Sequence, residues 1–228
     1  MTNGRVTGRA PRKDARRNYE RLLTAARAAF TEQGVGASLN DIARRAGVGN
    51  VTLYRHFPTR QALLEALLGE SLRGLRVRSD ALLTAAMPGD ALARWFEAAV
   101  EHAMTYRGLV DALVDSLADP ESDLHASCQA MKAGGAQLLV RAQQAGAVRP
   151  DVSASALFSL VAAVAWAVER APEDREQILA VLFDGLRPAT DPVRGDGGAR
   201  DRDSGGHTAS AEHCPGTRAD LCPLIRSG

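Results

Sequence analysis

The stretch that decides the fold runs from Ser38 to Phe57 and reads SLNDIARRAGVGNVTLYRHF. Ser38 followed three residues later by Asp41 is a capping-box pattern, which predicts a helix that begins near Leu39. Gly47 predicts the end of this helix, because glycine readily adopts the left-handed conformation of a helix C-terminus. The apolar positions recur at helical spacing on one face, at Leu39, Ile42, Ala43 and Ala46.

A second short helix follows the glycine turn and is closed by Pro58. It carries the apolar or aromatic residues Val51, Leu53, Tyr54 and Phe57. Two short helices joined by a glycine turn are typical of a helix-turn-helix, in which the second helix enters the major groove of DNA. The sequence therefore predicts a DNA-reading unit.

This segment resembles the DNA-binding signature of the TetR family of transcriptional regulators. The matching positions are Ser38, Ile42, Ala43, Ala46, Gly47, Val48, Thr52, Leu53, Tyr54, His56 and Phe57, followed by Thr59, Arg60, Gln61, Ala62, Leu63 and Leu64. Gly49 stands where the family usually has a capping serine, and Val51 stands where it usually has a small residue. The two departures bear on which bases are read.

The charge of the chain is distributed unevenly. Residues 1–60 hold 12 Lys or Arg against 4 Asp or Glu, a net charge of +8, whereas the whole chain carries only +1. Positive charge gathered around a helix-turn-helix is the pattern expected of a surface that binds phosphates.

Other features limit the class of protein. The basic N-terminus is followed by no apolar signal segment, and the longest apolar stretch, residues 156–168, is too short to span a bilayer. Cys128, Cys214 and Cys222 give no disulfide framework. We expect a cytoplasmic protein that neither contacts a membrane nor carries a cofactor or metal. No nucleophile–base pair or phosphate loop is present, so the sequence does not indicate an enzyme.

Helical periodicity continues along the rest of the chain. Helices are predicted from Asp14 to the glycines at 34 and 36, then over residues 60–85, 91–106, 108–118, 122–145, 154–170 and 172–187. Residues 188–228 are rich in Gly and Pro and lack hydrophobic periodicity, so we expect a disordered tail.

The second half of the chain resembles the ligand-binding domain of the SbtR-like branch of the same family. The resemblance lies in Trp95–Phe96, residues 105–109, Ser127–Cys128 and residues 142–151. We therefore expect an all-α protein of about nine helices: a flexible basic arm (1–13), a TetR-type helix-turn-helix DNA-binding domain (14–60), a helical ligand-binding and dimerisation domain (61–187), and the tail.

The resemblance assigns roles on the DNA-binding domain. It implies that phosphates are contacted by Ser38, Thr52, Tyr54, His56 and Arg60. The exposed positions left for reading bases are Asn50 and Val51, with Asn40 and Arg55 as further candidates. Asn can pair with adenine through two hydrogen bonds, and Val can touch a thymine methyl group. Arg44 and Arg45 fit a solvated face as well as they fit phosphate ligands.

The second domain offers candidates for a ligand pocket and for a dimer interface. The pocket candidates are Trp95, Phe96, Ala99, His102, Tyr106, His125, Cys128, Phe158 and Trp166. Each of these side chains also fits an ordinary core. The interface candidates are apolar positions of the last two helices: Leu157, Leu160, Val161, Val164, Val168, Ile178, Val181 and Leu182.

Together these observations predict a ligand-responsive, homodimeric transcriptional regulator. We expect a repressor that leaves a palindromic double-stranded DNA operator when a small hydrophobic effector binds. The alternative is a helical ligand-binding carrier or adaptor that no longer reads DNA, although such a protein would not need +8 around its motif.

Overall fold

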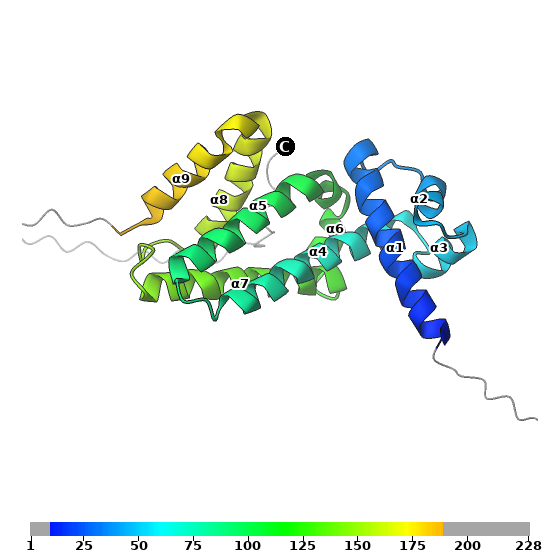
Figure 1. Cartoon of the computed structure of the whole chain (residues 1–228), viewed down its shortest axis with the longest axis horizontal. Coiled ribbons are helices and arrows are strands. Elements are labelled where there is room, and N and C mark those ends of the chain that lie inside the picture. The colour runs from blue at the N-terminus through cyan, green and yellow to red at the C-terminus, as the bar shows by residue number, and fades with distance from the viewer. Residues whose placement is uncertain (1–9, 189–228) are drawn as a thin grey trace, which may run out of the picture.

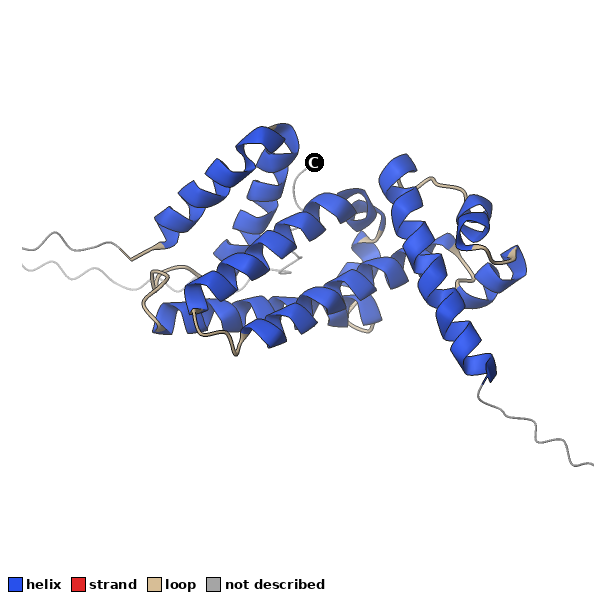
Figure 2. Cartoon of the chain, in the orientation of Figure 1, coloured by secondary structure: helices blue, strands red, loops and turns tan. Residues whose placement is uncertain are grey.

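The computed structural model describes residues 10–188, and within this range the chain is helical without any strand (Figure 1 and Figure 2). The all-α expectation is confirmed. The predictions for the first nine residues of the arm and for the tail from residue 189 onward concern residues outside the described range. The described helices are α1 (Ala10–Gln33), α2 (Leu39–Ala46), α3 (Asn50–His56), α4 (Arg60–Leu82), α5 (Pro88–Ala112), α6 (Val114–Ala118), α7 (Asp123–Gln144), α8 (Ala154–Arg170) and α9 (Arg175–Leu186), with a 3₁₀ turn at Pro172–Asp174.

Helices α1 to α3 lie at one end of the molecule, and α4 leads from them into the remaining bundle (Figure 1). The core of this end consists of side chains that are at most 5% exposed: Leu22, Leu23, Ala26, Phe30, Ile42, Leu53 and Phe57. In the larger part, α4 packs against α5 and α7, while α8 packs against α5 and pairs with α9. Helix α4 therefore packs against both parts of the molecule.

The local signals in the sequence set most of the helix ends. Ser38 Oγ accepts a hydrogen bond from the backbone N–H of Asp41 at 3.4 Å, and Thr59 caps α4 in the same way through Ala62. Gly47 adopts a left-handed conformation with φ of 63°. Only half of the capping box forms, because the Asp41 carboxylate pairs with Arg44 instead of reaching back.

Several predicted helix boundaries were wrong, and the largest differences lie in α1, α5 and α6. Helix α1 begins at Ala10 rather than Asp14. Helix α5 begins at Pro88, with Met87 in the capping position, rather than at Ala91. It then continues through Gly108, where a break was predicted, to Ala112. A glycine inside a helix costs only about 1 kcal/mol, which is offset here by burial of the flanking Tyr106, Leu109 and Val110.

Two adjacent glycines allow α7 to approach its neighbours closely. A Cβ atom on Gly134 would overlap the Ser79 side chain of α4, and a Cβ atom on Gly135 would overlap the Trp95 indole of α5. Trp95 is fully buried and donates from Nε1 to the carbonyl oxygen of Leu75 at 3.2 Å. The three helices are thus joined around one indole ring that fills its site completely.

Candidate functional site

Helix α3, which the sequence predicts to be the recognition helix, presents one face to the core and the other to solvent. Leu53 is buried, and Phe57, the residue that ends the helix, is buried as well. The opposite face exposes Asn50 and Arg55, together with Val51 at 68% and Tyr54 at 47% exposure. Val51 and Tyr54 therefore lie on a surface of α3 that is open to a binding partner.

The turn between α2 and α3 is held by backbone and side-chain hydrogen bonds. Gly47 N–H donates to the carbonyl oxygen of Arg44 at 3.0 Å, and Val48 N–H donates to that of Ala43 at 3.0 Å. Arg21 of α1 donates to the carbonyl oxygen of Gly47 at 3.2 Å. Gly49 provides no side-chain cap for α3. Thr52 N–H donates to the carbonyl oxygen of Gly49 at 2.9 Å, so the amides that lack a cap at the start of α3 are those of Asn50 and Val51.

The residues that the resemblance assigned to phosphates occupy different environments. Ser38 and Tyr54 are exposed, whereas Thr52 and His56 are half-buried. The His56 ring lies edge-on to Tyr19 of α1, with ring centroids 6.0 Å apart. Asn40, a further candidate for base contact, is exposed on α2. All of these lie on α2, on α3 or at the residue before α2, so the fold gathers them in one region.

The Arg60 side chain forms hydrogen bonds within the DNA-binding part of the protein. Its Nη1 donates to the carbonyl oxygens of Val35 and Ala37 at 2.7 and 2.6 Å. These bonds fasten the loop between α1 and α2 to the start of α4, which positions Ser38 and α2. The sequence pattern could not reveal this use, because the acceptors are backbone atoms more than 20 residues away.

Two arginines of α2 form ion pairs within the protein. Arg44 pairs with Asp41 at 2.7 Å, and Arg45 pairs with Glu32 at 2.7 Å. Both pairs are largely exposed, so each contributes little to stability and can be exchanged for a phosphate. Arg55, on the exposed face of α3, forms no ion pair with any residue in the range 10–188.

The pocket candidates of the second domain divide into a buried set and two outliers. The buried set is Trp95, Phe96, Ala99, His102, Tyr106, Cys128 and Phe158. Trp95 and Phe158 meet edge to face at 6.0 Å, and His102 and Tyr106 lie 5.0 Å apart. His125 is half-buried, and its Nδ1 lies 2.8 Å from the carbonyl oxygen of Leu117.

Trp166 does not join this set. It is 47% exposed on the far side of α8, where the Arg170 guanidinium stacks 4.0 Å from its ring centroid. Phe158 lies at the edge of the buried face of α8, and Trp166, eight residues later and about 80° further around the helix, falls outside that face. Trp166 is a surface residue.

His102 is a buried base. Its Nδ1 lies 2.8 Å from Ser71 Oγ of α4. Burial disfavours the charged imidazolium and lowers the pKa of His102 from 6.5 to about 4. The ring is therefore neutral at physiological pH and can accept or donate one hydrogen bond within the apolar core.

This burial predicts a loss of stability in acid. The unfolded chain takes up a proton at His102 below pH 6.5, whereas the folded chain resists until about pH 4, so stability present above pH 6.5 is lost as the pH falls. The expected contribution is about 3 kcal/mol. Urea unfolding of the wild type and of His102→Gln at about pH 7 and about pH 4 measures it. Equal losses in the two proteins would contradict the assignment.

The predicted dimer interface is largely buried within one protomer. Leu157, Val161, Val164 and Val168 are at most 6% exposed, because this face of α8 packs on its own α5. The prediction was wrong for these four residues: a long apolar stripe does not tell an internal contact from an external one. Leu160, Ile178 and Leu182 are half-buried, and Val181 is 67% exposed.

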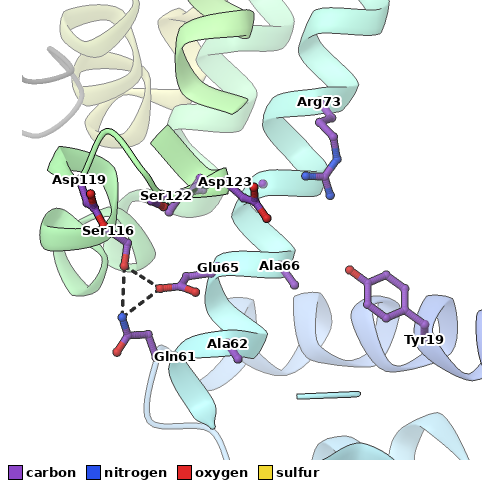
Figure 3. Close-up of a pocket in the computed structure, with 12 residues that line it drawn as sticks. Tyr19, Gln61, Ala62, Glu65, Ala66, Arg73, Ser116, Asp119, Ser122 and Asp123 are labelled. Atoms are coloured by element: carbon purple, nitrogen blue, oxygen red, sulfur yellow. Dashed lines mark hydrogen bonds between the residues drawn. The ribbon is translucent and has the colours of Figure 1, made fainter. Parts of the chain in front are cut away.

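A pocket that the sequence did not suggest lies where α1 and α4 meet α6 and the start of α7 (Figure 3). Its volume is about 590 Å³, and it is lined by Tyr19, Gln61, Ala62, Glu65, Ala66, Gly69, Arg73, Ser116, Asp119, Ser122, Asp123 and Leu124. These residues come from four segments spread over about a hundred positions, so no local motif could have gathered them.

Two kinds of feature are absent from residues 10–188. No helix there is both long enough and apolar enough to cross a bilayer. No group of three or more His, Cys, Asp or Glu side chains there is arranged to hold a metal ion.

Two families match the chain, one at each end. Residues 22–67 match the family described as bacterial regulatory proteins, tetR family. Residues 87–188 match the family described as transcriptional regulator SbtR-like, C-terminal domain.

Among curated proteins, an HTH-type transcriptional regulator of Staphylococcus aureus is 45% identical over 53 residues. This match covers 23% of the chain and spans only 29% of that relative's length.

Solved structures extend the likeness over nearly the full described chain. The TetR transcriptional regulator SCO0520 of Streptomyces coelicolor is 34% identical with a TM-score of 0.63, and the match covers 75% of this chain and 99% of that one. The TetR transcription regulatory protein of Mycobacterium vanbaalenii is 38% identical with a TM-score of 0.61, covering 78% and 99%. Both likenesses include the helix-turn-helix and the helical bundle.

Proposed function

This chain belongs to the TetR family of bacterial transcriptional regulators, and from that premise we propose that it is a repressor released from a palindromic operator by a small hydrophobic effector. The observation that carries the proposal is the exposed face of α3, which presents Asn50, Val51 and Tyr54 next to uncapped helix amides. An operator in chromosomal DNA requires the protein to act in the cytoplasm.

The proposed contacts divide into positioning and reading. Tyr54 and Ser38 donate to phosphate oxygens and fix the orientation of the domain, whereas Asn50 and Val51 reach the base edges. Arg55 and the ion-paired Arg44 and Arg45 add charge, which steers the protein to DNA and makes its affinity depend on salt. Arg60 supports the interface by holding the loop before α2.

Variants of α3 test this division. Asn50→Ala is expected to relax sequence preference at one base position by roughly 1–3 kcal/mol. Tyr54→Phe is expected to weaken binding to every sequence alike, because it removes a phosphate hydrogen bond and no base contact. Affinities for operator and scrambled duplexes, measured by fluorescence anisotropy over a salt series, separate the two effects. Gln137→Ala, an exposed amide on α7, is the matched control.

The assignments fail if Asn50→Ala leaves the sequence preference intact. They also fail if DNA affinity is independent of salt concentration. In a plot of log affinity against log salt concentration, each phosphate that the protein neutralises is expected to add about −0.9 to the slope.

We place the dimer at the exposed faces of α8 and α9. Trp166 and Val181 are the large apolar side chains exposed there, and small residues such as Ser159 and Ala163 lie beside Trp166 on the same face of α8. A two-fold dimer through this surface would set two α3 helices for successive major grooves, about 34 Å apart. A change in their separation would release the operator.

The effector proposal rests on the chemistry of the buried set in the second domain. Trp95, Phe96, Ala99, Tyr106 and Phe158 are apolar or nearly so, and His102 supplies one neutral polar group. Trp95 fills its site in this structure, so an effector would have to open space among these side chains. Their chemistry favours an apolar molecule with one or two hydrogen-bonding groups over a sugar or nucleotide.

A thermal-shift screen tests this chemistry. Apolar compounds that bind are expected to stabilise the protein by about 3 kcal/mol at a hundredfold excess over their dissociation constant, and sugars and nucleotides are not. The hit should also lower operator affinity. Stabilisation by hydrophilic polyanions alone would contradict the proposal.

The competing function is a carrier or adaptor that no longer reads DNA. The +8 charge of residues 1–60 and the exposed Val51 and Tyr54 argue against this function. A helix that no longer contacts DNA would require neither a concentration of positive charge around it nor large exposed apolar side chains. Electrophoretic retention of the chain's own upstream DNA decides between the two.

A further inference from the structure

The pocket at the junction of the two parts of the molecule is separate from the expected effector core. It shares no residue with the set around Trp95 and His102. Figure 3 shows α4 running through its centre, with Tyr19 and Arg73 on one side and Ser116, Asp119 and Ser122 on the other. Its volume of about 590 Å³ lies in the range of small-molecule sites.

Small residues on α4 leave this space open. Ala62, Ala66 and Gly69 recur at spacings of four and three, so they share one face of the helix, and that face forms the floor of the pocket. A Cβ atom on Gly69 would come within 3.2 Å of Arg73 Nη1. Larger side chains along this face would fill the pocket with protein atoms.

The lining is acidic. Glu65, Asp119 and Asp123 carry three formal negative charges against the single positive charge of Arg73. None of the three carboxylates forms an ion pair within residues 10–188, and Arg73 Nη1 is directed to Ser127 Oγ at 3.5 Å. The pocket therefore attracts cations and has acceptors to bind them.

Glu65 is held in place by neutral donors. Ser116 Oγ donates to Glu65 Oε1 at 2.6 Å, and Gln61 Nε2 donates to the same oxygen at 2.9 Å (Figure 3). Asp119 Oδ1 accepts from the backbone N–H of Glu121 at 3.0 Å. These bonds orient the carboxylates without neutralising their charge, as a site for an ammonium group requires.

Tyr19 connects the pocket to the recognition helix. One side of its ring lines the pocket, and the ring also packs against Phe57 at 5.2 Å and His56 at 6.0 Å. Burial raises the pKa of the Tyr19 phenol, and the nearby Glu70 adds to this rise against the opposing charge of Arg73. The Tyr19 side chain is therefore uncharged at neutral pH, and as part of the pocket lining it can contact a bound cation.

We propose that this pocket is a second effector site that binds a small organic cation, such as a linear diamine, and acts on α3 through Tyr19. The ammonium groups would pair with Glu65 and Asp123, with the aliphatic chain over Ala62 and Ala66. A ligand that displaces Tyr19 also disturbs its contact with His56 and Phe57 at the end of α3. The binding step is independent of the proposed function, whereas the coupling to DNA rests on it.

Calorimetry with the full chain tests the binding step. Cadaverine, a linear diamine, is expected to bind, whereas the linear diol of the same chain length is not. The double variant Glu65→Gln/Asp123→Asn keeps the shapes of both side chains and is expected to bind cadaverine about tenfold more weakly, or worse. The matched control Glu97→Gln/Asp111→Asn removes two exposed carboxylates outside the pocket and should bind as the wild type does.

A filling variant gives a second test that does not depend on charge. Ala66→Phe should abolish cadaverine binding while the thermal unfolding midpoint stays near that of the wild type. The site is refuted if the wild type does not bind cadaverine, if the diol binds equally well, or if the double variant retains full affinity.

Operator binding tests the coupling. Polyamines screen DNA in any protein–DNA assay, so the informative quantity is the difference between the wild type and the double variant at one cadaverine concentration. We expect a larger loss of operator affinity in the wild type. Equal losses of operator affinity in the two proteins would refute the coupling. If the wild type does not bind operator DNA at all, the proposed function is refuted, but the cadaverine binding measured by calorimetry is unaffected.

Discussion

Replacement of Trp166 and Val181 by aspartate is expected to give a folded monomer that binds its operator about a hundredfold more weakly. In the dimer, binding of one DNA-binding domain holds the other near its half-site, whereas two monomers must bind the two half-sites independently. Both side chains are exposed, at 47% and 67%, so the substitutions bury no charge within the protomer. Two carboxylates facing their symmetry mates in an apolar interface would prevent association.

Sedimentation at micromolar concentration and operator titration measure the two consequences. The control is Val77→Asp/Val140→Asp, which places the same charges on exposed apolar positions of α4 and α7. This control should remain dimeric and retain its operator. A stable dimer in the Trp166/Val181 variant would move the interface away from α8 and α9.

Val164→Asp is expected to unfold the protein rather than merely separate its subunits. Val164 lies on the same helix as Trp166 but on the buried face, 6% exposed against α5. An uncompensated carboxylate there costs several kcal/mol, which is a large part of the stability of a typical domain.

Circular dichroism during thermal unfolding measures this loss. Ser155→Asp, an exposed position in the first turn of α8, is the matched control and should unfold like the wild type. If Val164→Asp kept its unfolding midpoint and lost only dimerisation, the packing of α8 on α5 would be refuted.

Helix α8, which contains Val164 and Trp166, shows what an apolar pattern can and cannot predict. The apolar periodicity of α8 correctly gave its bounds, Ala154–Arg170. It could not say whether the apolar stripe faced the same chain or a partner, since both contacts favour the same residues. We predicted that the whole stripe contacts a partner subunit. In the structure, Leu157, Val161, Val164 and Val168 are buried in the core of one protomer.

The DNA-binding part was the more predictable, because its signals are local. The cap at Ser38, the left-handed Gly47 and the closing Pro58 act within a few residues, so the ends of α2 and α3 followed from the chain alone. The roles of individual side chains at the DNA remain predictions. For Arg60, tertiary structure added a use of Nη1 that no spacing contained.

The sequence by itself determined the all-helical class, the helix-turn-helix and the concentration of positive charge around it, because caps, periodicity and composition act over short distances. Only the tertiary structure decided which face of α8 is buried, that Trp166 is a surface residue, and that Tyr19, Glu65, Ser116 and Asp123 border one pocket. The physical reason is that burial and proximity depend on how helices pack, and packing joins residues far apart in the chain that no local pattern relates.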